Sequence, residues 1–480
     1  MPAPKASPWR DEFAATLRLA GPLAAANVLQ MLTYAIDVMF IARLGEDELA
    51  ASSLAVAVFG TVTWSLSALV GAVSAVAAAE LGARAPALRP IRRTVRMALW
   101  LSLAAGVFGM GVCAATEPLM RLTGQEPRLA ALAGSYMAIL QWSLIPMLAA
   151  AVLRNFVSTL GRPIFATLIT AGGIGVNALG NYALVFGRLG APALGLQGAG
   201  WATLLTALAV LAAYIAAIAM DPRLARYHVF GFFWRYDGRR MAELLRIGTP
   251  IALTVLAEAG VFSAAAFLMG RFGALPLAAH TLALQIAAFA FQVPFGVSQA
   301  ATIRVGLFFG ARDEPGIARA GIAALVLGTG CMMLTALAML VAPRWLLWVY
   351  VDPWAPANAA LVGLAVSYLT IAAAFQLSDG VQVVAAGALR GLQDTQVPMW
   401  IAVFSYWAVG FALAAGLGML TPLAGVGVWI GLAAGLTCTA GLMLHRWQRR
   451  GALGLTAMES RATAASSPRL KRPLRVRARS

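Results

Sequence analysis

The chain is 480 residues long; 61% of them are hydrophobic and only 11% are charged, which gives a mean hydropathy of +0.79. A soluble domain carries about 25% charged residues, so this composition excludes an ordinary soluble protein and predicts a polytopic membrane protein. The formal net charge of +17 does not indicate a nucleic-acid partner, because the basic residues are spread over many short loops and one tail.

The apolar stretches predict twelve membrane-spanning helices, each long enough to cross a hydrocarbon core of about 30 Å. The N-terminal segment contains acids and no cleavage-site pattern, so we interpret the first span as an uncleaved insertion signal. The predicted spans are 16–42, 51–80, 94–115, 129–152, 163–187, 197–220, 246–270, 276–305, 317–341, 357–388, 397–420 and 424–446.

The basic residues are divided unequally between the two sides of these spans. One side, with both tails and every second loop, holds 30 of the 36 lysines and arginines; Arg154 and Arg390 are counted there as loop residues. By the positive-inside rule this side is cytoplasmic, so we expect a multi-pass protein of the bacterial inner membrane with both termini cytoplasmic. The basic, aromatic connection 221–246 is expected to lie on the inner membrane surface. The Arg-rich tail 449–480 is interpreted as disordered and attracted to anionic lipid.

The two halves of the chain resemble each other at an offset of about 228 residues, since Pro22 falls on Pro250 and, at a slightly different offset, Arg154 falls on Arg390. Six spans per half is an even number, so both halves enter the membrane from the same side and the repeat is parallel. This predicts an all-α membrane protein of two six-helix lobes, with a substrate site between them near the midplane. The predicted domains are an N-lobe at 1–220, a cytoplasmic linker at 221–246, a C-lobe at 247–448 and a tail at 449–480.

Three carboxylates, Asp37, Glu258 and Asp379, fall well inside apolar spans, where each costs at least about 2.5–3.5 kcal/mol. Their spans contain no lysine or arginine expected to neutralise them. Asp37 is expected roughly 9 Å below the outer surface, and Glu258 and Asp379 both roughly 16–18 Å from the cytoplasmic side. Because the last two share one lobe and one depth, we expect them to form a single site that holds a proton or a cation.

Uncharged polar side chains follow the same helical faces. Gln30, Tyr34 and Asp37 are spaced by four and three residues in the first span, and Gln382 lies three residues after Asp379. Such side chains line a cavity or form interhelical hydrogen bonds worth about 0.6 kcal/mol each, and the spacing alone leaves both interpretations open. In the eighth span, Gln285, Gln292 and Gln299 recur every seven residues. The candidate cavity residues from these stripes are Gln30, Tyr34, Gln285 and Gln382.

Several segments, in this order, resemble the multidrug and toxic compound extrusion (MATE) family in its bacterial NorM-like branch. The resemblance extends over nearly all spans, from Leu19 to about Arg446. The segments are ARLGEDELAA (42–51), RNFVSTLGRP (154–163), LGLQGAGWAT (194–203), AAHTLALQ (278–285), QAATIRVG (299–306) and GALRGLQDTQVP (387–398).

This resemblance implies export of small amphipathic organic cations, driven by inward Na⁺ or H⁺, through a cleft between two lobes. It implies cation or proton sites at Asp37 in the N-lobe and at Glu258 and Asp379 in the C-lobe, with Na⁺ at the last two if Na⁺ is the coupling ion. Phe291 matches an aromatic position that helps to hold the coupling cation in some relatives. Asn177 matches a position that faces the N-lobe cavity.

Other classes of protein are less consistent with the sequence. No Ser–His pairing, phosphate loop or His/Cys/Asp cluster indicates an enzyme, and we expect no cofactor besides the coupling ion. The cysteines are interpreted as packed residues, and we expect a monomer. The alternative function is a flippase for lipid-linked saccharides on the same fold; it would need a basic central cavity, whereas the three acids predict an acidic interior. Neither the drug nor the coupling ion follows from the sequence.

Overall fold

The computed structural model describes residues 8–83, 86–122 and 124–456 of the chain. Every regular element in these ranges is helical, and twelve helices are long and apolar enough to cross a membrane. The predicted fold class and the predicted twelve spans are confirmed. The observed ends lie within eight residues of the predicted ones, because the helices continue past their apolar segments into polar sequence.

The first six spans are built from nine α-helices and a short 3-10 turn. They are α1 (Pro8–Ile41), α2 (Glu46–Val70) with α3 (Ala72–Ala83), α4 (Leu88–Ala114) with α5 (Thr116–Leu122), α6 (Pro127–Leu140) with η1 (Gln141–Ser143) and α7 (Leu144–Thr159), α8 (Ile164–Phe186) and α9 (Leu196–Met220).

The last six spans follow a short connection that contains α10 (Pro222–Ala225). They are α11 (Gly238–Arg271), α12 (Ala274–Ala311), α13 (Glu314–Val341), η2 (Pro356–Asn358) with α15 (Ala359–Gly391), α16 (Gln396–Val403) with the π-helix η3 (Phe404–Phe411) and α17 (Ala412–Leu420), and α18 (Ala424–Gln448). The short α14 (Pro343–Leu347) lies between α13 and η2.

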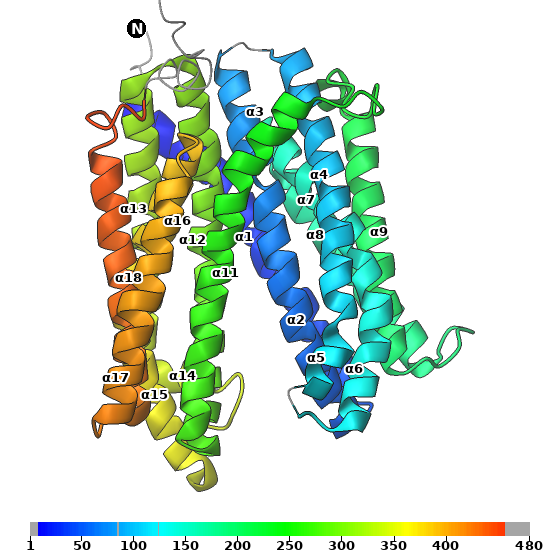
Figure 1. Cartoon of the computed structure of the whole chain (residues 1–480), viewed down its shortest axis with the longest axis vertical. Coiled ribbons are helices and arrows are strands. Elements are labelled where there is room, and N and C mark those ends of the chain that lie inside the picture. Colours follow the sequence, from blue (N-terminus) through cyan, green and yellow to red (C-terminus); the bar gives the residue numbers. More distant parts are fainter. Residues whose placement is uncertain (1–7, 84–85, 123, 457–480) are drawn as a thin grey trace, which may run out of the picture.

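The two halves of the chain form two bundles that lie side by side (Figure 1). Helix α1 packs on α8 of its own bundle and on α12 of the other, and α2 packs on α11. The start of α1, the connection between α9 and α11 and the described end of the chain all lie at the upper end of Figure 1. Both ends of the described chain therefore lie on the same side, as an even number of spans requires.

The bundles approach each other most closely near this upper end, where α3 crosses α12. A Cβ atom on Gly82 would lie 1.9 Å from the carbonyl oxygen of Leu307, and one on Gly310 would lie 1.9 Å from that of Ala79. Small residues let two membrane helices bring their backbones together, and the spacing of Gly306 and Gly310 is that of a GxxxG motif. This contact closes the space between the bundles at this end.

Two ion pairs strengthen the same end of the interface. Arg304 of α12 donates to the buried carboxylate of Glu12 on α1, with the shorter contact at 2.5 Å. Arg240 at the start of α11 pairs with Glu80 of α3. Both pairs join the N-terminal bundle to the second half of the chain.

The connection between the bundles is shorter than predicted. The segment 238–246, assigned to the linker 221–246, is helical, because the side chain of Asp237 caps α11 by accepting from the backbone N–H of Arg240 at 3.3 Å. The remaining connection is attached to the N-terminal bundle: Trp100 of α4 donates to the carbonyl of Phe233 at 3.0 Å. Of the predicted tail, 449–456 forms turns against the second bundle, and 457–480 lies outside the described residues.

Candidate functional site

The carboxylate of Asp37 lies in a cavity of ≈140 Å³ inside the N-terminal bundle. The side-chain amides of Asn177 and Asn181 donate to Asp37 Oδ1 at 2.9 and 2.7 Å. Asp37 is 8% exposed and the two asparagines are 0% exposed. The carboxylate is therefore held in one orientation by neutral donors, which fix its position without cancelling its charge.

The local sequence explains this arrangement. Gln30, Tyr34 and Asp37 lie on one face of α1, and all three line the same cavity. Asn177 and Asn181 are one turn apart on α8, so both amides reach the same carboxylate oxygen. Asn181 was not among the predicted site residues, although its spacing from Asn177 could have identified it.

The second bundle contains the other two carboxylates in a larger cavity. Glu258 of α11 and Asp379 of α15 both line a space of ≈400 Å³, and they are close enough for their charges to interact. Neither forms an ion pair within 4.0 Å in the part of the chain that the structure describes. Most of the remaining lining is apolar, including Phe291, Phe295 and Met443. The structure thus brings together the two carboxylates that were expected to share one site.

Two more of the candidate residues line this cavity. Gln382 lies three residues after Asp379 and is 3% exposed, and its Oε1 has no hydrogen-bond partner. The ring of Phe291 stacks on Phe295 with 5.8 Å between the ring centroids. The cavity therefore combines two acids, an amide and a pair of aromatic rings.

Gln285 does not line the cavity of Glu258 and Asp379. Its side chain is exposed, and it lies outside the lining of the cavities described here, whereas Gln292 and Gln299 line the space between the bundles. At 1.5 Å per residue, Gln285 lies roughly 10 Å along α12 from Gln292. A seven-residue spacing keeps side chains on one face but does not keep them within one cavity.

Two arginines line the cavities of the acids, contrary to prediction. Arg390 belongs to the last turn of α15, lines the cavity of Glu258 and Asp379, and interacts electrostatically with Glu258. Arg154 belongs to α7 and lines the cavity of Asp37. The interpretation of both as loop residues is wrong, because α7 and α15 continue past them. Asp394, four residues after Arg390, forms an ion pair with Arg446 at 2.6 Å.

A third cavity, of ≈380 Å³, lies between the bundles. Residues of α1, α2, α3 and α7 line one side and residues of α11, α12 and α15 line the other. Trp64 and Phe295 belong to its lining and contact each other, with 5.6 Å between their ring centroids, and both also line the cavity of Glu258. Arg154 and Arg390 belong to its lining, and none of its lining residues is acidic. The expectation of an acidic interior therefore holds for the lobe cavities and is wrong for the space between the lobes.

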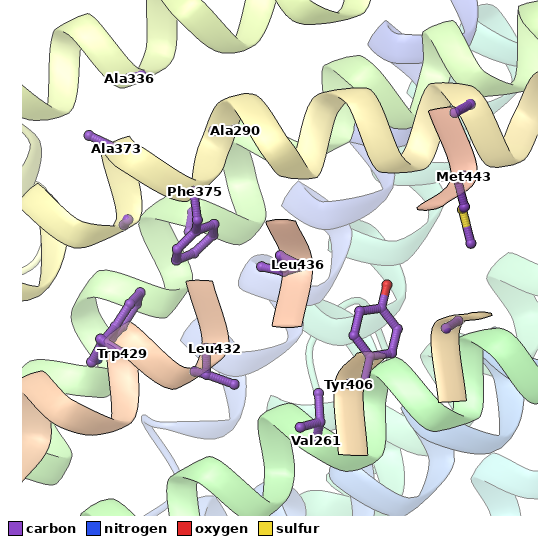
Figure 2. Close-up of a cluster of buried hydrophobic side chains, with 14 of the residues drawn as sticks. Val261, Ala290, Ala336, Ala373, Phe375, Tyr406, Trp429, Leu432, Leu436 and Met443 are labelled. Carbon is purple, nitrogen blue, oxygen red and sulfur yellow. The ribbon is translucent and has the colours of Figure 1, made fainter. Parts of the chain in front are cut away.

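Sequence reasoning also missed Tyr406, a residue of the C-terminal bundle that is only 1% exposed. It projects from the π-helix η3 into the buried cluster that contains Val261 and Leu436 (Figure 2). A π-helix changes which face of a helix a residue occupies, and such segments are frequent at functional sites. No residue pattern in Phe404–Phe411 reveals it in advance.

The described residues contain no group of three or more His, Cys, Asp or Glu side chains placed to hold a metal ion. The described cysteines, Cys113, Cys331 and Cys438, form no disulfide. Protein oxygen ligands for a monovalent cation in the C-terminal bundle would come from Glu258 and Asp379.

Comparison with known proteins gives consistent results. The MatE family model matches residues 22–183 and 250–415, one segment in each half of the chain. The chain is 44% identical over 442 residues to the "Probable multidrug resistance protein NorM" of Mesorhizobium japonicum, covering 92% of this chain and 95% of that protein. It is 42% identical to the protein of the same name from Brucella suis, with coverages of 93% and 94%.

Solved structures share the fold at lower identity. A multidrug resistance MATE family transporter in an outward-facing conformation superposes with a TM-score of 0.83 at 21% identity, covering 92% of this chain and 96% of that one. A MOP superfamily transporter from Pyrococcus furiosus gives a TM-score of 0.82 at 20% identity, with coverages of 93% and 97%.

Proposed function

We propose that this chain, which belongs to the MatE family of multi-pass membrane transporters, is a multidrug efflux antiporter that exports organic cations in exchange for Na⁺ or H⁺. The family consists of transporters, so the chain is not an enzyme. Relatives named as multidrug resistance proteins match it over more than nine-tenths of its length, which supports drug export. The observation that carries the proposed ion coupling is the placement of Glu258 and Asp379 in one largely apolar cavity.

Coupling would arise from competition for these carboxylates. Arg390 can balance at most one of the two carboxylate charges in this cavity, so the pair still needs a further counter-charge, because removing charged groups from water is costly. A proton, a Na⁺ ion or the cationic group of a substrate can each supply it, and charge balance disfavours binding two of them together. If the transporter changes conformation only when the carboxylates are neutralised, inward ion movement drives outward substrate movement.

The other lining residues would set the breadth of recognition. Trp64 and Phe295 offer ring faces to flat apolar molecules, and such contacts do not require one shape. Phe291 has no hydroxyl, so its contribution to cation binding is limited to its ring face. Asp37, oriented by Asn177, would provide a second proton or cation site in the N-lobe.

Alternating access requires the contact between α3 and α12 to open. In the present conformation Gly82 and Gly310 close the end of the molecule that carries the connection between the lobes. The concentration of basic residues in the loops and tails at this end favours a cytoplasmic location, in the inner membrane of a bacterium. We expect the transporter to act as a monomer surrounded by lipid.

Transport of a fluorescent organic cation into inside-out vesicles tests this proposal. Uptake should follow an imposed pH gradient or an imposed Na⁺ gradient, and Glu258→Gln should abolish the gradient-dependent part. Equal uptake by vesicles with and without the protein, under both gradients, would contradict drug export. Uptake that needs the protein but ignores both gradients would contradict the coupling alone.

The flippase alternative is favoured by one observation, the presence of Arg154 and Arg390 in an acid-free cavity between the lobes. A substrate with a phosphate group would need such a cavity. The acids of the C-lobe cavity and the names of the relatives favour cation export instead. Inhibition of dye uptake by a polyprenyl phosphate sugar, without effect from competing organic cations, would reverse this preference.

A further inference from the structure

Arg154 and Arg390 occupy matching places in the two halves of the fold. In each half the arginine follows a leucine, lies near the end of the fourth span of its bundle, and lines both its own lobe cavity and the cavity between the lobes. Arg154 lies five residues before the end of α7, and Arg390 lies one residue before the end of α15. The internal repeat thus brings two guanidinium groups to one shared space.

Neither arginine forms a close ion pair. Within the described residues, no acidic oxygen lies within 4.0 Å of either guanidinium group. Arg154 donates to the uncharged Oε1 of Gln30 at 3.5 Å, which is too long to be a strong hydrogen bond. Glu258 interacts with Arg390 electrostatically from the C-lobe cavity, and Asp37 shares the N-lobe cavity with Arg154.

The shared cavity contains a further donor without a partner. Asn27 of α1 is 5% exposed, and its Nδ2 has no hydrogen-bond partner. A buried amide N–H₂ left unpaired destabilises the protein, so it favours a ligand that accepts hydrogen bonds. Two guanidinium groups and an amide donor without a partner therefore line a cavity of ≈380 Å³ whose lining has no acid.

We propose that Arg154, Arg390 and Asn27 form an anion subsite between the lobes, which binds the carboxylate or phosphate group of an amphipathic molecule. Guanidinium groups bind such anions through paired charge-assisted hydrogen bonds. The apolar body of the ligand lies against Trp64 and Phe295, which line both this cavity and that of Glu258. A molecule that carries both charges can therefore place its cationic end near Glu258 and its anionic end at the arginines.

The test compares two probes that differ only in the anionic group: rhodamine B, which has a free carboxylate, and its methyl ester. Their affinities are measured by fluorescence anisotropy on the purified full chain in an uncharged maltoside detergent. The affinity ratio is the readout, because it cancels effects common to both probes. The wild type should bind rhodamine B about tenfold more tightly than the ester, as expected for charge-assisted hydrogen bonds. The double variant Arg154→Gln/Arg390→Gln should reduce this ratio to about one.

Two controls accompany the double variant. Arg162→Gln removes a positive charge just after α7 from a residue that pairs with Asp221 and does not line the cavity, so it should keep the wild-type ratio. The double lysine variant keeps both charges and should keep part of the preference. If the double glutamine variant does not fold, the single variants Arg154→Gln and Arg390→Gln are measured instead. Each should reduce the ratio of the two probe affinities about threefold.

A second binding experiment tests whether the bound anion is the phosphate group of a lipid or the carboxylate of a substrate. Dioctanoyl phosphatidylglycerol is titrated calorimetrically into the wild type and the double glutamine variant. A tenfold weaker affinity in the variant supports a subsite for lipid phosphate, whereas the change in the rhodamine ratio supports a subsite for a substrate carboxylate. If the variant changes neither quantity, the anion subsite is wrong. Because both arms measure binding alone, this result is separate from the outcome of the ion-coupling experiment.

Discussion

Adding a single methyl group at the contact between the lobes should change which conformation the transporter prefers. In Gly310→Ala the new Cβ would lie 1.9 Å from the carbonyl oxygen of Ala79 and 2.9 Å from the backbone nitrogen of Ala83. A carbon and a carbonyl oxygen approach no closer than about 3.3 Å, so α3 and α12 must separate by roughly 1.4 Å at this point. Forcing a methyl group into a packed contact costs typically about 1–3 kcal/mol. This cost falls on the conformation in which the lobes touch here, so the conformation open at this end gains about 5- to 150-fold in relative population.

Thiol accessibility measures this change. Ala75 lines the cavity between the lobes and is fully buried. A cysteine is therefore introduced by Ala75→Cys in a variant that lacks the native cysteines. Its rate of reaction with a membrane-impermeant thiol reagent, measured in inside-out vesicles, reports how often this end of the molecule opens. Gly310→Ala should raise the labelling rate and lower drug transport. Gly330→Ala on α13 is the matched control, because a Cβ there would meet nothing within 4 Å. If Gly310→Ala has the same labelling rate and the same drug transport as the wild type, the contact between α3 and α12 is not the part that opens.

The carboxylates and the orientation of the chain give three further predictions. Asp37→Asn should abolish ion-driven efflux while the protein still accumulates, and full efflux by this variant would remove the N-lobe from the mechanism. Asp37→Ala should also lower thermal stability, because the buried side-chain amide of Asn177 loses its acceptor at a cost of roughly 1–3 kcal/mol, whereas Asn181 keeps its bonds to Asn177. Glu258→Gln and Asp379→Asn should each eliminate ion-coupled efflux, and the double variant should be little worse than either; additive partial losses would instead indicate two independent sites. A reporter fused at Arg226, in the connection between the lobes, should read as cytoplasmic, and a periplasmic reading would reverse the orientation.

The fold could be predicted from the sequence because a membrane span is encoded locally. A run of about 20 apolar residues must be helical in lipid, whatever its neighbours are, since its backbone groups have no other partners. Helix ends are less well encoded. Arg154 and Arg390 lie next to apolar sequence near the ends of their spans. In the sequence, such a residue looks the same whether it begins a loop or ends a helix.

The candidate site was predictable only in part, for a related reason. The stripe that contains Gln30, Tyr34 and Asp37 shows which face of α1 is polar, but the spacing within one helix does not show which helix faces it. The bond from Asn177 to Asp37 joins residues 140 positions apart, and Asn177 was expected in that cavity only from the family resemblance. The position of Tyr406 depends on a π-helix, which shifts the side chains around the helix axis without a recognisable sequence signal.

The most direct test of exchange is the reverse reaction. Purified protein is reconstituted into liposomes with equal pH and equal Na⁺ on both sides, and a steep gradient of an organic cation is then imposed. Coupled exchange requires the substrate to drive H⁺ or Na⁺ across the membrane in the opposite direction, and this flux should disappear in the Glu258→Gln/Asp379→Asn variant. Substrate movement through the wild type with no opposing flux of either ion would contradict the proposed antiport.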